Sequence, residues 1–137
     1  GEEEAMTRLS RWAVRLALVH FVAGIALGAT MLAAKGGFGP VRILGHRPVH
    51  IHMMLFGWLV QLAIGVAYWI LPKFSDEPRR GTPHLAAASV VLLNLGVALG
   101  TTSPWLPRVG AAGWALEALA TGLFAWHIWP RVKGFGA

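Results

Sequence analysis

The sequence predicts an all-α fold, a four-helix transmembrane bundle that forms a single domain over residues 1–137. Hydrophobic residues make up 55% of the chain and charged residues only 13%, whereas soluble domains usually carry about 25% charged residues. The mean hydropathy is +0.57. Four apolar runs are also long enough to cross the hydrocarbon core, which takes about 20 residues per helix. We expect the spans at residues 12–34, 49–71, 85–101 and 109–129.

Prolines and tryptophans support each span in order. Pro48 stands at the start of the second run and Pro72 at its end, and Thr82-Pro83 is typical of a helix start. Pro104 and Pro107 interrupt the third connection, and Pro130 ends the fourth run. Tryptophans occupy the expected membrane interfaces, as in an aromatic belt. They are Trp12, Trp69, Trp105, Trp126 and Trp129.

The distribution of lysine and arginine predicts the orientation of the spans. Eight of the 12 basic residues fall in the N-terminal segment, the second connection and the C-terminal segment. These are Arg8, Arg11, Arg15, Lys73, Arg79, Arg80, Arg131 and Lys133, and the other side holds Lys35, Arg42, Arg47 and Arg108. Because cytoplasmic loops are enriched in Lys and Arg, both termini are expected in the cytosol of a prokaryote, with the chain as a multi-pass protein of the cytoplasmic (inner) membrane.

Composition excludes several classes of function. The chain has no cysteine, which excludes disulfides, zinc–thiolate sites, iron–sulfur clusters and covalently attached haem. The net charge of +6 is explained by basic residues flanking apolar runs, so no nucleic-acid partner is expected. No nucleophile–base pair, phosphate-binding loop or paired carboxylates indicate a hydrolase or an ATP-driven enzyme. The first run is too long for a cleavable signal peptide, and the acidic residues 1–5 precede Met6, which is typical of a native start.

Six histidines are the main chemical signal, because ionisable groups inside a bilayer are costly and need a reason. His46, His50 and His52 lie at the expected outer end of the second span, and His46 is expected to be solvated. His84 and His127 lie at the inner ends of the third and fourth spans, whereas His20 is nearer the middle of the first. Interfacial anchoring is the structural alternative for each of these histidines.

A helical wheel at about 100° per residue separates His50 from His52. His50, Gly57, Gln61 and Tyr68 share one face, and we expect this small and polar face to point into the protein. His52 lies on the opposite face, which predicts contact with lipid, another subunit or headgroups. Neutral imidazole binds iron well, and Gly57 removes bulk from the same face. The residues therefore favour haem ligation by His50.

Depth limits the pairing of iron ligands. His50 and His20 differ by roughly 15 Å in depth at 1.5 Å per residue, so they are not expected to share one iron. His20 and His127 differ less in depth and could share a site. Met31 is near the depth of His50, so a second ligand to that iron comes from Met31, water or a gas, His52, His46, or another subunit.

Other polar and small residues have both functional and packing interpretations. Glu117 is the single acidic residue inside a span, and it either takes part in proton movement or bonds across helices. Gln61 and Asn94 are expected to bond between helices. The glycine pairs Gly24/Gly28 and Gly96/Gly100 either permit close helix contacts, including contacts between copies of the chain, or are ordinary glycines of membrane helices.

The second span carries a resemblance to a known family. It reads HIHMMLFGW from His50 to Trp58 and continues as AYWILP from Ala67 to Pro72. This resembles the second helix of subunit I of haem-copper oxidases and nitric oxide reductases, and short four-helix bacterial relatives with an H-x-H…G-W second helix look closer still. The resemblance implies that His50 is a haem ligand. No three-histidine copper site or HPEVY-like segment follows, so a complete oxidase is not predicted.

Three functions remain open at this stage. The leading one is a protein binding haem b that carries electrons or binds NO or O2, with cofactor-binding residues His50, His52, His20, His127, Gly57 and Met31 and iron ligands among His50, His52 and His20. Its expected partners are the lipid bilayer, further copies of the chain as a trimer or dimer, and a respiratory redox partner. The alternatives are a two-haem electron carrier, with His84 also a candidate on the inner side, and a non-redox structural, assembly or copper-handling subunit.

Overall fold

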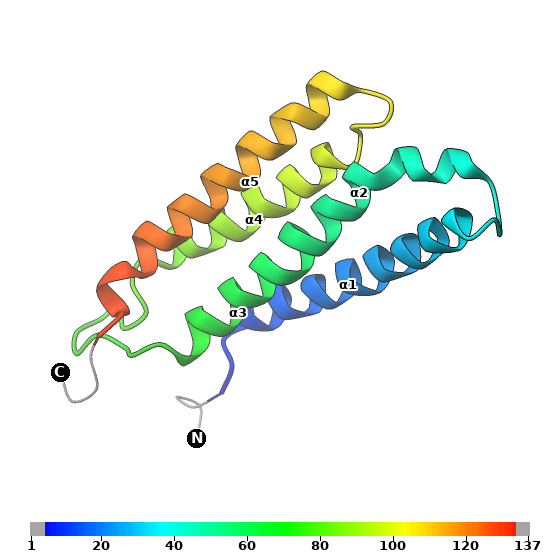
Figure 1. Ribbon diagram of the computed structural model, residues 1–137. Helices are drawn as coiled ribbons and strands as arrows, with labels where there is room; N and C mark the ends of the chain where they lie inside the picture. The colour runs from blue at the N-terminus through cyan, green and yellow to red at the C-terminus, as the bar shows by residue number, and fades with distance from the viewer. Residues whose placement is uncertain (1–4, 134–137) are drawn as a thin grey trace.

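In a computed structural model of the chain, residues 5–133 are described, and every regular element among them is helical. The four helical rods run side by side along one axis (Figure 1). Each is long and apolar enough to cross a membrane. The prediction of an all-α fold with four membrane-length helices is therefore confirmed.

The first rod is α1, Arg8–Lys35, which begins four residues before the predicted span. Thr7 caps it, since the Ser10 backbone N–H donates to the Thr7 hydroxyl at 3.1 Å. Such an N-cap satisfies one of the free amide groups in the first turn. A short 3-10 turn, η1 (Val41–His46), then leads into the second rod.

The second rod is continuous but changes its helix type. It consists of α2 (Arg47–Ile51), the π-helix η2 (His52–Val60) and α3 (Gln61–Ile70). Bonding continues across the junction, where the Gln61 N–H donates to the Phe56 carbonyl five residues earlier. Nine residues of π-helix are unusual, because this form occurs mostly as single turns and often near functional sites.

The third and fourth rods form a hairpin. They are α4 (Pro83–Gly100), the shortest of the four, and α5 (Pro107–Ile128), followed by the 3-10 turn η3 (Trp129–Arg131). Prolines open both helices, as their fixed φ and missing N–H favour. The predicted spans thus hold to within a few residues at each end.

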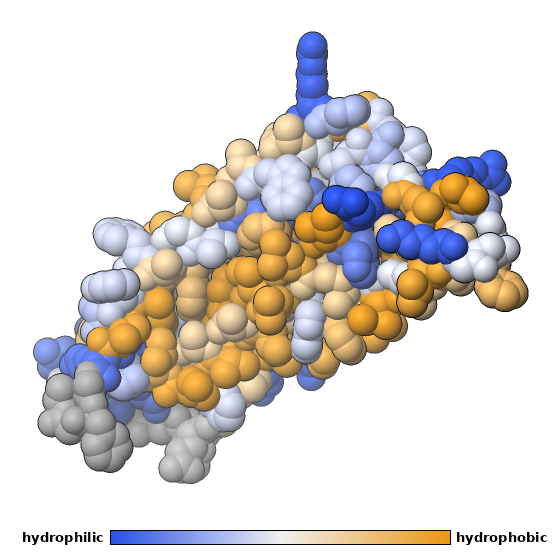
Figure 2. Space-filling model, in the orientation of Figure 1, coloured by the Kyte–Doolittle hydropathy of each residue, from blue (hydrophilic) through white to orange (hydrophobic). Residues whose placement is uncertain are grey.

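The second rod has α1 packed on one side and α4 on another, while α4 and α5 pack tightly together. One end of the molecule, here called the basal end, contains Arg8, Ile70, Pro83 and Ile128; the other is the distal end. Figure 2 shows hydrophobic residues over the middle of the visible face and hydrophilic ones gathered toward the two ends. Several tryptophans near the ends are exposed: Trp12, Trp105, Trp126 and Trp129. This surface suits a membrane protein.

Candidate functional site

His50 lies in the seam between α1 and the second rod. Its Nδ1 is 2.8 Å from the Gly24 carbonyl oxygen of α1. A carbonyl only accepts hydrogen bonds, so Nδ1 carries the proton and, in the neutral ring, Nε2 carries the lone pair. The ring is half-buried. This is the tautomer that a metal bound through Nε2 requires.

A glycine on α1 provides the space for the His50 ring. A β-carbon on Gly28 would lie 2.6 Å from His50 Cε1, closer than such atoms approach. Gly24, one turn earlier, similarly lies against the Met54 side chain. The glycine pair Gly24/Gly28 is therefore used for packing within the chain.

His20 repeats this arrangement in the opposite direction. Its ring projects from α1 onto the second rod, where a β-carbon on Gly57 would lie 2.6 Å from His20 Cγ. Its Nδ1 is 2.9 Å from the Leu16 carbonyl oxygen, which again places the lone pair on Nε2. The sequence singled out Gly57 as a residue that removes bulk, and the ring that fills this space belongs to His20.

The two rings of the seam are closer in depth than the sequence indicated. His20 packs on Gly57, seven residues from His50, so the offset is about 10 Å at 1.5 Å per residue rather than roughly 15 Å. This is still too far for both to ligate one iron. Met31 lies one turn beyond Gly28 on α1 and is buried.

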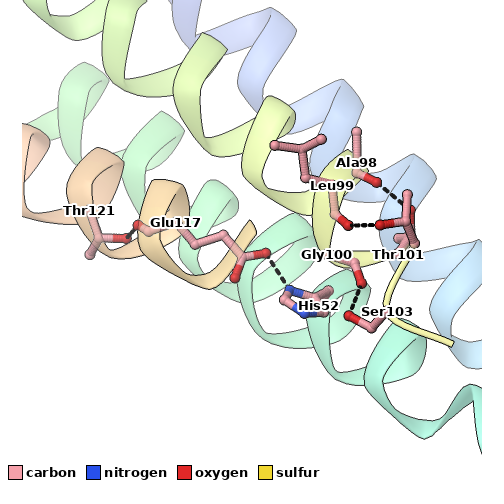
Figure 3. Close-up of polar contacts among 9 residues, drawn as sticks. His52, Ala98, Leu99, Gly100, Thr101, Ser103, Glu117 and Thr121 are labelled. Carbon is pink, nitrogen blue, oxygen red and sulfur yellow. Dashed lines mark hydrogen bonds and ion pairs between the residues drawn. The ribbon is translucent and has the colours of Figure 1, made fainter. Parts of the chain in front are cut away.

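His52 occupies a second, fully buried site between the second rod and α5. Its Nδ1 is 2.6 Å from Glu117 Oε1, and both side chains are 0% exposed. Figure 3 shows the two side chains meeting across the gap between these helices. The ring also contacts Trp114, with 4.1 Å between ring centroids. His52 Nε2 and Glu117 Oε2 are buried without a hydrogen-bond partner in the structure.

The prediction that His52 faces lipid, another subunit or headgroups was therefore wrong. The second rod has protein on two sides, so His50 meets α1 while His52 meets α4 and α5. In addition, the π-helix that begins at His52 has more residues per turn than the wheel assumed. Gln61 consequently turns away from the His50 seam and accepts a 2.5 Å hydrogen bond from Asn94 of α4.

Small residues let α4 and α5 enclose the buried pair. A β-carbon on Gly96 would lie 2.8 Å from Glu117 Cγ, and one on Gly100 would collide with the His52 ring. One on Gly113 would lie 2.7 Å from the Gly100 Cα. The second glycine pair of the sequence, Gly96/Gly100, thus also packs within the chain.

The basal end holds a third polar group that the sequence did not identify as such. Arg131 was noted for orientation, yet its side chain is fully buried. It donates to the carbonyls of Tyr68, Leu71 and Pro72 at 3.0, 2.6 and 2.8 Å. A cation suits these free carbonyls at the C-terminus of α3. Hydropathy alone cannot reveal this role, because the acceptors lie about 60 residues away in sequence.

His127 belongs to this basal group and not to a site with His20. Its ring lies 6.3 Å from the Tyr68 ring by centroids, and a β-carbon on Gly81 would lie 2.8 Å from His127 Nε2. Tyr68 is 11 residues beyond Gly57, so His127 and His20 are about 16 Å apart in depth. The structure does not bring these two histidines together. His84 is exposed at the same end.

Among residues 5–133, no three His, Asp or Glu side chains come together in a group that could hold a metal ion. The predicted site residues thus fall into three places: His50, His20, Gly57 and Met31 at the α1 seam, His52 in the buried pair, and His127 at the basal end. His50 and His20 each have Nε2 free of its proton in a half-buried ring, so each could serve as a single metal ligand. Comparison of the chain with protein-family models, curated proteins and solved structures gives no match.

Proposed function

We propose that this chain is a b-type haem-binding membrane protein that transfers electrons or binds a small gas such as NO or O2. The observation that carries the proposal is the hydrogen bond from His50 Nδ1 to the Gly24 carbonyl. It fixes the ring in the Gly28 notch with the lone pair on Nε2. The likeness of the second span to oxidase subunit I, which implies a haem ligand at His50, supports the same residue.

Bound haem would supply one-electron exchange at iron and a coordination position for a diatomic gas. The chain contributes the ligand, its tautomer and its orientation. His50 cannot share an iron with His20, so a second ligand would come from Met31, a gas or water, or a residue of a second copy. A half-buried ring at the surface of the seam favours a haem held between copies, which agrees with the proposed dimer or trimer.

The proposed location is the cytoplasmic membrane of a prokaryote, with the basal end in the cytosol. Eight of the 12 basic residues lie toward the basal end and four toward the distal end. His50 is then near the outer surface, where a respiratory partner can exchange electrons with the haem. A complete oxidase is not proposed.

The decisive experiment is an absorption spectrum of the full chain purified from haem-replete cells, oxidised and reduced, with and without CO or NO. We expect a Soret band that is lost or shifted in His50→Ala and unchanged in His84→Ala. The second variant removes an exposed histidine and serves as the matched control. Helical content measured by circular dichroism establishes that both variants fold. A colourless, iron-free preparation would overturn the proposal.

The two-haem carrier is the second candidate, and the carbonyl-bound ring of His20 favours it. The sequence allowed one haem at His50 or His52 and another at His20, His84 or His127. With His52 buried against Glu117 and His127 packed at the basal end, this candidate would have separate haems on His50 and His20. Two irons per chain, with one lost in His20→Ala, would support this version. One iron per chain or fewer would exclude it.

A further inference from the structure

The basal end contains a basic cavity that the haem proposal does not use. This cavity has a volume of about 390 Å³ and opens beside the connection between α3 and α4. Its lining includes Tyr68, Lys73, Arg79, Arg80 and Gly81. A cavity rich in cationic side chains at the end of a membrane bundle suits an anionic group.

Two guanidinium groups at the basal end each have one buried N–H without an acceptor. Arg80 Nε and Arg131 Nη1 are both buried without an acceptor in the structure. Arg80 and Tyr68 both line the cavity, and the fully buried Arg131 guanidinium lies 5.5 Å from the centroid of the Tyr68 ring. The unused Arg80 donor lies in the same lining as Lys73 and Arg79, and this favours a bound anion, because phosphate oxygens accept such bonds and offset the repulsion between like charges.

The acidic residue at the cavity does not cancel this charge. Glu77 lines the rim, but it is 81% exposed and pairs with Arg79 at 3.5 Å. Lys73 and Arg80 also line the cavity, and among the residues that the structure describes no acidic residue besides Glu77 does. The cavity therefore keeps a positive interior.

An apolar groove continues from the cavity along the membrane surface. This groove, about 460 Å³, shares Thr7, Tyr68 and Pro83 with the cavity. It adds Leu9, Trp12 and Ala87 between α1 and α4, together with Arg8 and His84. An acyl chain of a lipid can bury its apolar surface in such a groove, whereas a free phosphate ion makes no favourable contact with it. Trp12 is half exposed at the expected interface, a usual place for tryptophan.

We infer that the basal end binds an anionic phospholipid, with its phosphate in the basic cavity beside Arg80 and an acyl chain in the groove between α1 and α4. This inference is independent of haem. The basic residues at the basal end, which the positive-inside pattern linked only to membrane orientation, would then also bind a specific ligand.

The test measures lipid binding to the full chain in detergent by native mass spectrometry. Phosphatidylglycerol and phosphatidylcholine with identical acyl chains are compared, and inorganic phosphate is added as a competitor. We expect phosphatidylglycerol to bind at least several-fold more tightly. Arg80→Gln should reduce this preference about five-fold, since one basic residue near an anionic lipid contributes about that factor. Arg108→Gln, the same charge change on an exposed distal residue, should leave it unchanged.

A second variant tests the groove separately from the charge. Ala87→Phe fills the groove and should weaken binding of long-chain phosphatidylglycerol more than that of a short-chain form. Equal binding of the two headgroups, competition by millimolar phosphate alone, or an equal effect of Arg108→Gln would each overturn the inference. Preferential binding of a neutral quinone at the groove would also overturn it.

Discussion

His52 Nδ1 and Glu117 Oε1 lie 2.6 Å apart, and neither side chain has any surface exposed. This contact joins the second rod to α5, 65 residues away in sequence. Gly96, Gly100 and Gly113 bring α4 and α5 close enough to seal it. The arrangement gives each buried side chain one hydrogen-bond partner, which lowers the cost of keeping a histidine and a carboxyl group inside an apolar protein.

Replacing Glu117 tests the value of this contact. Glu117→Ala leaves the His52 N–H buried without an acceptor, and it should lower the free energy of unfolding by about 1–3 kcal/mol. Glu117→Gln keeps a carbonyl oxygen that can accept the same bond and should cost less. Thermal unfolding in detergent followed by circular dichroism measures both. Equal stability of the alanine and glutamine variants would show that the bond contributes little.

Glycine substitutions test the close packing around His52. Gly100→Ala places a methyl group against the His52 ring, and overpacking of this kind usually costs about 1–3 kcal/mol. Gly122→Ala is the matched control, because nothing lies within 4 Å of its would-be β-carbon. The control should be neutral or stabilising, by about 0.5–1 kcal/mol from helix propensity. If the Gly100→Ala and Gly122→Ala variants unfolded at the same temperature, the close packing of Gly100 against the His52 ring would be contradicted.

Arg131 offers a test of the basal end. Arg131→Lys keeps the charge but cannot reproduce the fork that reaches three carbonyls of the α3 terminus. We expect a loss of at least about 2 kcal/mol, since single hydrogen bonds to charged groups contribute about 1.5–3 kcal/mol. Arg108→Lys on the exposed distal surface is the control and should show no change. If Arg131→Lys were as stable as the parent chain, the positive charge at residue 131 would stabilise the basal end without the forked hydrogen bonds.

The sequence predicted the parts of the fold that depend on local chemistry. The four apolar runs and their bounding prolines placed each rod to within a few residues, and the third was correctly the shortest. The side-chain contacts between different helices were harder to predict from the sequence. The wheel put His50 and His52 on different faces, but it could not show that α4 and α5 of the same chain cover the His52 face. The sequence from His52 onward also contains no sign of nine residues of π-helix. Arg131 looked like a topology signal, because the carbonyls it binds belong to another helix.

Gly28→Ala connects the packing of the seam to the proposed haem. The added methyl group would meet the His50 ring, so the ring must leave the notch and its bond to Gly24. If His50 holds iron, haem content should fall several-fold or the Soret band should shift, while Gly122→Ala leaves both unchanged. An unaltered spectrum in a folded Gly28→Ala variant would argue against His50 as the ligand.

The proposed orientation is testable with introduced cysteines, because the native chain has none. Ser75 lies exposed in the basal connection between α3 and α4, and Arg42 lies exposed in the distal turn η1. With the basal end in the cytosol, a membrane-impermeant maleimide should label Arg42→Cys in intact spheroplasts and should label Ser75→Cys only after lysis. The same reagent on the parent chain controls for non-specific reaction. The reverse pattern would place the termini outside, because the bundle has an even number of spans. It would also put His50 and its proposed haem near the cytosol, where a different electron donor would have to reach it.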